Sequence, residues 1–388
     1  MEDWWLWSSD DLVNWELEYT LEPEETYIGK PFDQCWATDF IKRNGKYYWY
    51  FSEGNRQTGV MVGDSPSGPW KDPLGKPLLT EEMTTTDEYD MGIVQDEQGE
   101  YYIVFGVWDF YIARLNEDMI SLAETPRKIE IINPRGPYNL DGKNIEKPTD
   151  DKPFIHFYNG KFYLSWGCFY AMSDHIYGPY DYMGSIIEQE SFAPGFDSPT
   201  WPTGFKQGRH GSFFEWHGQW YFAYCDISQT GNRYFRDTFI SYVYYRENGE
   251  IAIIRIDGTG VGEYDANSLP IEAEDFFKAS GIKKKEKQTG GFILTDISDN
   301  DFLIFPNIAG LESKSGIELN LEAMKQLTIE IRKDNPTGEL LASTELFPAR
   351  TVSALFMDIP NLSTIANICF VFRGSGENLL DFDSFSFK

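Results

Sequence analysis

The sequence predicts an all-β protein built from two units, a propeller of five blades followed by a β-sandwich. Three observations support this fold class. A turn followed by an aromatic-rich strand recurs four times, the texture of the chain changes after about Glu263, and no segment shows helical periodicity over a useful length. The length of 388 residues exceeds one ordinary domain and agrees with two units.

The four repeats lie in the first part of the chain. Each reads as a polar residue and a glycine followed by an aromatic-rich strand, at Asn44–Ser52, Gln98–Gly106, Asn159–Gly167 and His217–Cys225. Their glycines, 54, 61 and 58 residues apart, are Gly45, Gly99, Gly160 and Gly218. An apolar segment precedes each repeat, so each glycine is expected in a tight turn between two strands. A repeat of this length built from short strands is typical of propeller blades.

A second motif marks the turns into outer strands. GDSPSGPW (Gly63–Trp70) and MSDHIYGPY (Met172–Tyr180) share a Ser-Asp pair followed by Gly-Pro and an aromatic residue. A related signal, WSSDDLVNW (Trp7–Trp15), stands near the start of the chain with no aromatic repeat before it. We therefore expect four full blades and a first blade that is incomplete at the N-terminus.

After about Glu263 the chain changes to alternating strands separated by regular turns, namely FLIF, GIELNL, LTIEIRK, ICFVFRG and DSFSF. This pattern predicts a sandwich of about 100 residues. We expect the boundary near Leu269 to Ile271, which divides the chain into 1–268 and 269–388. The alternative, that the segment merely closes the propeller, fits poorly with its length.

The composition narrows the classes of partner. Lys and Arg total 33 against 62 Asp and Glu, a formal net charge of −29. Such a surface repels phosphate backbones, which argues against nucleic-acid binding. It suits a neutral glycan, although solubility in a salty or extracellular medium explains the charge as well. No apolar run approaches the ~18–20 residues that cross a membrane, so no membrane partner is expected.

The aromatic share of 16% serves a β core or sugar stacking, and composition does not separate these uses. The four cysteines, Cys35, Cys168, Cys225 and Cys369, are far apart and form no CxxC pair. The first three fall on apolar strand patterns, where we expect buried free thiols.

The propeller motifs resemble glycoside hydrolase family 43. The likeness covers Trp4 to Glu263 and is best to the β-xylosidase and α-L-arabinofuranosidase branch, through WLWSSDDLVNW, CWATDFIKRNGKYYWYFS, GDSPSGPWKDPLGKPLL and IARLNEDMISL. The resemblance implies a five-bladed propeller and an inverting, exo-acting hydrolase of xylan-type or arabinan-type chains. It further implies a polysaccharide or oligosaccharide partner, no organic cofactor, a monomer, and a secreted or periplasmic location, although no signal peptide is visible.

The tail, from Ile271 to Lys388, resembles a family 6 carbohydrate-binding module through IEAEDFF, the Gly290-Gly291 turn, NDFLIF, LTIEIRKDNPTGELL and FDSFSF. This resemblance implies a structural calcium site formed by Glu272, Glu274 and Asp383, since carboxylates are the hard oxygen ligands that this ion prefers. Phe302 and Phe356 stand where stronger binders carry Tyr or Trp.

Inverting hydrolysis needs a carboxylate that activates water and an acid that protonates the leaving oxygen, about 6.5–9.5 Å apart. Asp90, nine residues before Gly99, matches a third carboxylate that orients the acid in the family; a turn or cap role is the alternative. Asp151 falls where the family has its catalytic Glu and is one methylene shorter. It is a working acid, a weakened one or a loop residue, with Asp150 and Glu146 as close alternatives.

Further candidates follow from the same resemblance. His210 matches a central-channel histidine of the family that binds an axial water or a calcium ion. The alternative is a purely structural role. Arg236 matches a substrate-facing arginine of the family, and the alternative is that it forms a surface salt bridge. Asp39 stands at a position of substrate contact. The aromatic residues that are candidates for stacking on sugar, each with core packing as its alternative, are Trp36, Trp166, Phe169 and Trp201.

The family's base Asp belongs to the first strand of blade one, upstream of the segment that Met1 begins, so we assign no base. Two hypotheses remain: an exo-acting hydrolase, and a glycan-binding propeller with a degraded site. Both depend on the four glycine hairpins being successive blades that bring Asp90, Asp151 and His210 together around one axial hole.

Overall fold

The protein is described by a computed structural model, and the residues that it places are 1–133, 149–193, 210–226, 236–268, 270–348 and 353–388. Over these residues the chain forms strands and three short 3-10 helices, η1 (Pro23–Glu25), η2 (Gln189–Ser191) and η3 (Ala273–Asp275). No α-helix occurs among them, and no helix is long and apolar enough to cross a membrane. The expected all-β class is confirmed.

Within the described residues, the first part of the chain forms five sheets in sequence order. They consist of β1 (Trp4–Ser8) and β2 (Glu16–Leu21); β3 (Cys35–Arg43), β4 (Lys46–Glu53), β5 (Gln57–Gly63) and β6 (Trp70–Lys71); β7 (Gly92–Gln95), β8 (Tyr101–Phe105), β9 (Tyr111–Arg114) and β10 (Arg127–Lys128); β11 (Ile131–Ile132), β12 (Pro153–Tyr158), β13 (Lys161–Trp166), β14 (Phe169–Ser173) and β15 (Tyr180–Ser185); and β16 (Gly211–Trp216), β17 (Gln219–Asp226) and β18 (Asp237–Val243). Pairing is antiparallel except between β11 and β15. The Gly-Pro motifs lead into the outer strands β6 and β15, as expected.

Three of the four repeat hairpins turn through two residues with positive φ. These pairs are Asn44-Gly45 (51° and 77°), Asn159-Gly160 (46° and 80°) and His217-Gly218 (57° and 82°). Such a turn matches the right-handed twist of its strands and requires residues that tolerate φ > 0. The tight-turn prediction is confirmed for these three.

The hairpin at Gly99 is built differently. The Asp96 carboxylate accepts the backbone N–H groups of Gln98 (3.0 Å) and Glu100 (2.9 Å), and the Asp96 N–H donates to the Glu100 carbonyl (3.0 Å). An aspartate that holds its own loop replaces the two-residue turn, because Asp side chains readily bond nearby backbone N–H groups.

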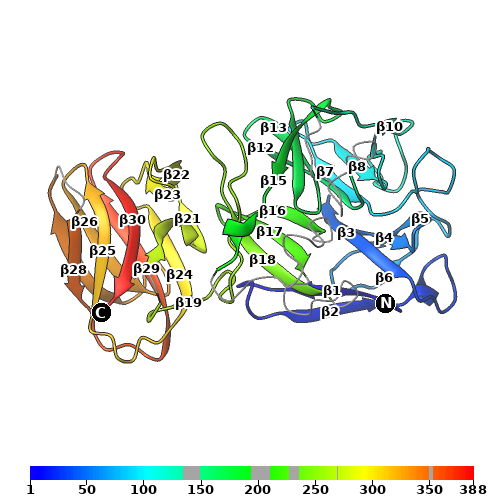
Figure 1. Ribbon diagram of the computed structural model, residues 1–388. Coiled ribbons are helices and arrows are strands. Elements are labelled where there is room, and N and C mark those ends of the chain that lie inside the picture. Colours follow the sequence, from blue (N-terminus) through cyan, green and yellow to red (C-terminus); the bar gives the residue numbers. More distant parts are fainter. Residues whose placement is uncertain (134–148, 194–209, 227–235, 269, 349–352) are drawn as a thin grey trace.

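In each of four successive sheets, one edge strand opens the repeat hairpin and is called the first strand below. These first strands contact one another in order: β3 with β7, β7 with β12, and β12 with β16. Figure 1 shows these strands in the middle of the larger part of the molecule. The approach is close at Gly92, where a Cβ atom would lie 3.0 Å from the Pro153 carbonyl oxygen and 3.1 Å from Cδ2 of Phe154. Residues at the starts of these strands are therefore brought near one another.

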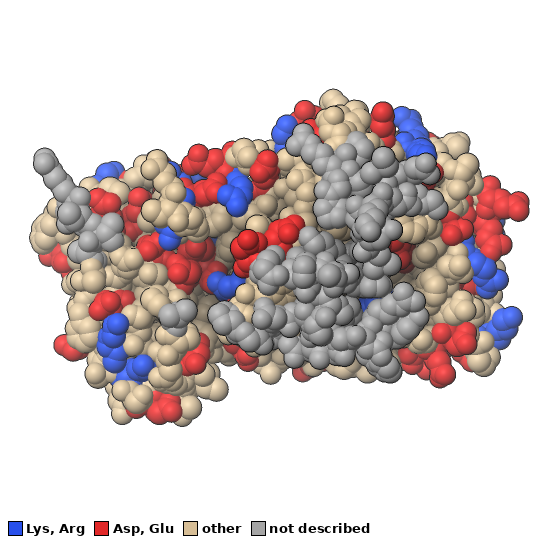
Figure 2. All heavy atoms as spheres, viewed as in Figure 1, with Lys and Arg blue, Asp and Glu red and all other residues tan. Residues whose placement is uncertain are grey.

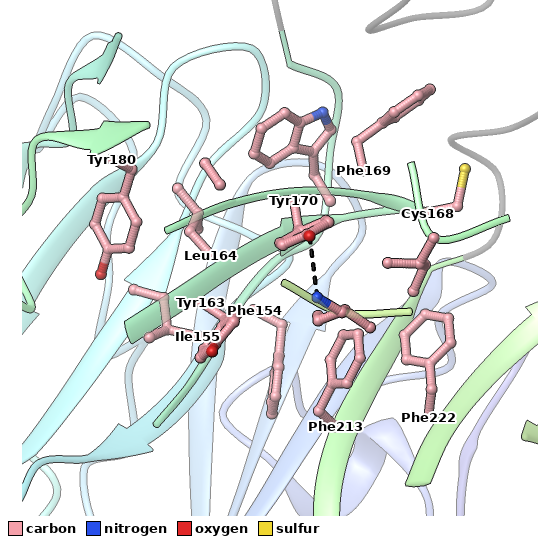
Figure 3. Close-up of a cluster of buried hydrophobic side chains, with 14 of the residues drawn as sticks. Phe154, Ile155, Tyr163, Leu164, Cys168, Phe169, Tyr170, Tyr180, Phe213 and Phe222 are labelled. Atoms are coloured by element: carbon pink, nitrogen blue, oxygen red, sulfur yellow. Dashed lines mark hydrogen bonds between the residues drawn. The ribbon is translucent and has the colours of Figure 1, made fainter. Parts of the chain in front are cut away.

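Aromatic side chains fill the largest core of this part, which runs from β7 to β18 and its following loop. In Figure 3 the labelled rings of Phe154, Tyr170, Phe213 and Phe222 crowd into the space between neighbouring strands. The Tyr170 hydroxyl accepts the N–H of Ile251 at 3.1 Å, which ties the loop after β18 to β14.

The C-terminal part is a sandwich of two sheets. One contains β19 (Tyr264–Asp265), β21 (Lys278–Ser280), β24 (Phe302–Ala309), β26 (Leu327–Lys333), β27 (Leu340–Leu346) and β29 (Ile365–Gly374). The other contains β20 (Ile271–Glu272), β22 (Lys283–Glu286), β23 (Phe292–Thr295), β25 (Gly316–Ala323), β28 (Ser353–Asp358) and β30 (Leu380–Phe387). The strands expected from the alternating pattern all form. Tyr264 and Ala266 already belong to the sandwich core, which thus reaches back before residue 269.

Polar contacts join the sandwich to the fifth sheet beside it (Figure 1). Arg255 forms an ion pair with Asp275 at 2.7 Å. The Tyr264 hydroxyl donates to the Asp275 carbonyl (2.6 Å) and lies 3.0 Å from the hydroxyl of Tyr242. The Gln219 side-chain amide donates to the carbonyl of Glu274 (2.8 Å). These contacts fix the start of the sandwich against β17 and β18.

Acidic side chains dominate the face drawn in Figure 2, where red patches on both parts of the molecule outnumber blue ones. This distribution agrees with the net charge of −29. All four cysteines are free, and Cys225 is the one that is partly exposed rather than buried.

The close approach of β7 and β12 yields a stability prediction. Gly92→Val places side-chain atoms against the Pro153 carbonyl and the Phe154 ring. We expect the free energy of unfolding to fall by about 1–3 kcal/mol, the usual cost of overpacking. Urea denaturation measures it. Gln98→Ala, exposed on the turn of the same sheet, is the control and should leave the midpoint unchanged.

Candidate functional site

Three of the candidate residues occupy equivalent places, directly before the first strands of successive sheets. Asp90 lies two residues before β7, Asp151 two residues before β12, and His210 one residue before β16. Because these strands contact one another in order, their starts meet at one end. The structure thus brings the three side chains together, as the repeat spacing predicts.

Asp90 is held in a strained and buried position. Its φ is 56°, in the left-handed region that non-glycine residues rarely adopt, and it is 4% exposed. Its backbone N–H donates to the Ser52 hydroxyl at 3.1 Å, which anchors this conformation. Burial raises the pKa of Asp90 to about 7, and the negative charge of Asp151 adds to this rise. The carboxyl is therefore poised between its two states near neutral pH.

Asp151 and His210 form an ion pair in which Oδ1 lies 2.5 Å from Nε2. Burial alone would raise the pKa of Asp151, but the charge and hydrogen bond of His210, followed by the charge of Arg236, bring the pKa below its usual value. Burial opposes the charge on His210 too, yet the Asp151 carboxylate raises its pKa to about 9. Near neutral pH the pair is an imidazolium and a carboxylate.

The environment thus shifts the pKa values of the two aspartates in opposite directions, upward for Asp90 and downward for Asp151. Two carboxyl groups with divergent pKa values are the usual mark of an acid and an ionised partner. The sequence interpretation assigned the proton to Asp151, and the surroundings in the structure favour Asp90.

Arg236 lies one residue before β18 and is exposed. Its Nη1 donates to the Cys225 sulfur at 3.5 Å, and its charge acts on Asp151. An exposed guanidinium next to an acidic pair is suited to bind sugar hydroxyls, because it presents several N–H donors in a fixed fork.

Lys152 is a site residue that the sequence interpretation missed. It is 5% exposed, and its ammonium donates to the carbonyl of Met91. Its backbone N–H bonds to the Asp90 carboxylate, and its charge lowers the pKa of both Asp90 and Asp39. The available signal was a lysine directly before the apolar run PFIHF, where a buried cation requires acidic partners.

Asp39 joins two sheets. Its Oδ1 accepts the N–H of Phe40 at 2.7 Å, and its Oδ2 accepts the N–H of Ile93, on β7, at 2.6 Å. Burial raises its pKa while Lys152 and these hydrogen bonds oppose the rise. Oδ2 thus bridges β3 to β7 while Oδ1 bonds within β3, and the predicted substrate contact of Asp39 stays a prediction.

The aromatic candidates separate by exposure. Trp36 is 38% exposed and packs edge-on against Tyr89, the neighbour of Asp90, with centroids 5.8 Å apart. Trp166 and Phe169 are 0% exposed and belong to the large aromatic core, so their assignment to substrate binding is wrong. Both lie at the turn between β13 and β14, where the sheet packs on its neighbours.

Two further candidates, Trp201 and Glu146, lie outside the described residues. Asp150, the other alternative to Asp151, accepts the N–H of Trp108 at 2.7 Å through its backbone carbonyl. This contact holds the segment that leads into Asp151.

The carboxylates expected to hold calcium have other partners in the structure. Lys287 pairs with Asp383 at 2.5 Å, and Glu274 Oε1 accepts the N–H of Phe292 at 3.1 Å. No group of three or more His, Cys, Asp or Glu side chains among the described residues converges in a way that could hold a metal. Calcium takes six to eight oxygen ligands, so this arrangement, with an ammonium on Asp383, does not fit the ion.

The aromatic candidates of the sandwich lie on different sheets. Phe356, on β28, is 52% exposed and covers Gly316, where a Cβ atom would lie 2.2 Å from the ring. Phe302 starts β24 in the opposite sheet and is partly buried. They cannot form one sugar platform, and of the two candidates Phe356 is the one with an exposed ring.

Comparisons with known proteins give the following similarities. The family model described as glycosyl hydrolases family 43 matches residues 1–251. The chain is 26% identical over 98% of its length to an arabinoxylan arabinofuranohydrolase of Paenibacillus polymyxa, of which it spans 66%. It is 28% identical over 66% of its length to a xylosidase/arabinosidase of Bacteroides ovatus, covering 84% of that protein.

Among solved structures, the chain is similar to a family 43 arabinoxylan arabinofuranohydrolase of Bacillus subtilis in complex with cellotetraose. The TM-score is 0.54 at 22% identity, with 100% of this chain and 88% of the other covered. This likeness extends through the sandwich and supports the all-β fold of both parts.

The raised pKa of Asp90 gives a prediction for stability. The native state keeps the Asp90 proton up to pH about 7, whereas an unfolded aspartate releases it near 3.9. The stability that protonated Asp90 contributes is complete below pH about 4 and is lost as the pH rises through 7. Asp90→Asn removes this loss, so its melting temperature relative to wild type should be higher at pH 8 than at pH 5, by about 2–4 °C. Differential scanning fluorimetry measures this difference.

The exposed Asp10→Asn on the N-terminal hairpin is the matched control and should show the same offset at both pH values. A constant offset for Asp90→Asn would contradict the buried, proton-holding state of this carboxyl.

Proposed function

The chain belongs to family 43 of the glycosyl hydrolases, and from this premise we propose that it hydrolyses β-xylosyl or α-L-arabinofuranosyl linkages of xylan-type polysaccharides. The names of its relatives, xylosidase/arabinosidase and arabinoxylan arabinofuranohydrolase, support this substrate class. The observation that carries the proposal is the pair of adjoining carboxyl groups, Asp90 and Asp151, with divergent pKa values. We expect an inverting, exo-acting enzyme that works outside the cell or in the periplasm.

The architecture proposed for this function is a five-bladed propeller at 1–268 and a carbohydrate-binding sandwich at 269–388. Five sheets in sequence order, with first strands that contact one another in order, support the propeller. A separate apolar core supports the second unit, although that core includes Tyr264. The exposed ring of Phe356 is the feature of the sandwich that suits a sugar face.

The proposed chemistry starts from the proton on Asp90. Asp90 donates it to the glycosidic oxygen as the bond from that oxygen to the anomeric carbon breaks. Water adds to the carbon and releases a proton to the solvent, from which Asp90 regains its own proton. Asp151 stays ionised because the His210 imidazolium pairs with its Oδ1, and this carboxylate stabilises the positive charge that develops on the sugar ring. A buried donor beside a fixed carboxylate supplies both effects without reorganisation of solvent.

Lys152 tunes this balance. Without its charge the pKa of Asp90 would rise further, and the proton would be held too tightly at neutral pH. Arg236, whose charge acts on Asp151, and Trp36, which packs against the neighbour of Asp90, provide donors and an apolar face for the sugar. These sugar-binding groups and a general acid suit a glycan, which is uncharged and is therefore not repelled by a protein of net charge −29.

A second candidate is a glycan-binding propeller that does not cleave. The observation that favours it is the ion pair of Asp151 with His210, which keeps the residue at the family's acid position ionised. The two candidates differ in turnover, since both require sugar to bind near Trp36 and Arg236.

Hydrolysis of aryl β-xyloside and aryl α-L-arabinofuranoside tests the proposal. Asp90→Asn and Asp151→Asn should each lower kcat/KM by at least about 10²-fold, the contribution of a positioned acid or charge. Wild-type kcat/KM should fall as the pH rises above about 7, when Asp90 loses its proton. Asp64→Asn, exposed on an outer turn, should retain wild-type rates. Activity that survives both site substitutions would rule out this assignment, and binding without turnover would favour the second candidate.

Trp36→Ala tests the sugar contact. Loss of the exposed indole should raise KM about 3–10-fold with little change in kcat, because the ring binds the ground state and transition state alike. Steady-state kinetics on the better aryl glycoside measure both constants. Trp15→Ala, in the loop between β1 and β2, is the comparison and should leave KM unaltered. An unchanged KM in Trp36→Ala would remove this residue from the site.

A further inference from the structure

The acidic cluster of the sandwich is built where its first and last strands pair. Glu272, on β20, faces Ser384 of β30 in the ladder, and Asp383 is the preceding residue of β30. Glu274 follows in η3 and is 4% exposed, with its Oε2 atom buried and without a hydrogen-bond partner among the described residues. Burial and the nearby charges of Asp275 and Glu272 raise the pKa of Glu274 to about 8, which shows that charge among these carboxyl groups is costly without a cation.

The cation is supplied by the chain itself. The Lys287 ammonium contacts Asp383 Oδ1 at 2.5 Å, with the two side chains 25% and 22% exposed. The charges of Glu272 and Glu274 also act on Lys287, so its ammonium lies in the field of all three carboxylates. Lys287 thus contacts Asp383 directly and interacts through charge with the other two residues expected to coordinate a metal.

Two of the other oxygen atoms accept N–H donors, whereas Glu274 Oε2 has no partner among the described residues. Asp383 Oδ2 accepts the side-chain amide of Asn320 at 2.7 Å. Glu274 Oε1 accepts the backbone N–H of Phe292 at 3.1 Å. A calcium ion needs six to eight oxygen atoms at 2.3–2.6 Å, and a neighbouring ammonium repels it. The oxygen atoms present are therefore arranged around a monovalent cation, the lysine ammonium, and not around calcium.

The turn between β22 and β23 delivers the lysine. The Lys287 N–H donates to the Gly291 carbonyl (2.9 Å), and the Gly290 N–H donates back to the Lys287 carbonyl (3.0 Å). A Cβ atom on Gly291 would lie 3.3 Å from Lys287 Cε, so this glycine leaves the path of the side chain open. The Gly-Gly pair therefore has a packing role in addition to its positive φ values of 91° and 75°.

We propose that the Lys287 ammonium is the permanent cation of this acidic site and that the sandwich keeps its stability without calcium. The inference is independent of which sugar the propeller cleaves. One lysine then balances the acidic side chains, a role that the family resemblance gives to a divalent ion. The site is then insensitive to chelators and to the calcium level of the medium.

The test compares melting temperatures of the full chain in millimolar calcium chloride and in excess EGTA. Wild type should melt within about 1 °C in the two conditions and carry no stoichiometric calcium by mass spectrometry. Lys287→Met should melt about 5 °C lower in EGTA and recover in part with calcium, since its carboxylates then lack a cation. Lys285→Met, exposed on β22, is the matched control and should resemble wild type.

A wild-type protein that loses several degrees in EGTA, or that contains one calcium per chain, would overturn the proposal. So would a Lys287→Met variant that melts like Lys285→Met and ignores calcium. If Lys287→Met fails to fold, the wild-type calcium and EGTA measurements decide alone. Activity on aryl glycosides, read in parallel, separates failure of this inference from failure of the proposed hydrolysis.

Discussion

The contact between the first strands of successive sheets is the constraint on which this protein depends. Because β3, β7, β12 and β16 approach one another, the residues that precede them are forced into one small space. Gly92 shows how tight the approach is, since a single added carbon would reach the Pro153 carbonyl. The closeness that stabilises the fold also buries Asp90 beside Asp151, and burial beside a like charge is what gives Asp90 its unusual pKa.

A strongly acidic chain has to neutralise carboxylates in its interior, and it does so with a few well-placed cations. His210 pairs with Asp151, Lys152 acts on Asp39 and Asp90, and Lys287 pairs with Asp383. The first two set protonation states at the candidate active site, whereas the third stabilises the sandwich. The same electrostatic rule thus serves chemistry in one unit and folding in the other, because a buried carboxylate is stable only when it is protonated or paired.

The candidate site was only partly visible in the sequence. Asp90, Asp151 and His210 could be found because each stands near a repeat in a motif that resembles the family. Lys152 was missed because a lysine before an apolar strand has the same pattern whether its ammonium is buried or exposed. Trp166 and Phe169 were misassigned because aromatic residues in a repeat look alike in a core and in a pocket, and burial depends on neighbouring sheets that local sequence does not describe.

The sequence by itself determined the all-β class, the position of the hairpins and the order of the sandwich strands. These features rest on alternation, turn residues and repeat spacing, which are local properties of the chain. Only the tertiary structure decided that Asp90 rather than Asp151 has the raised pKa and that Lys287 lies among the acidic residues of the sandwich. Protonation and ion pairing depend on burial and on charges brought from distant segments, so they exist only once the sheets have packed.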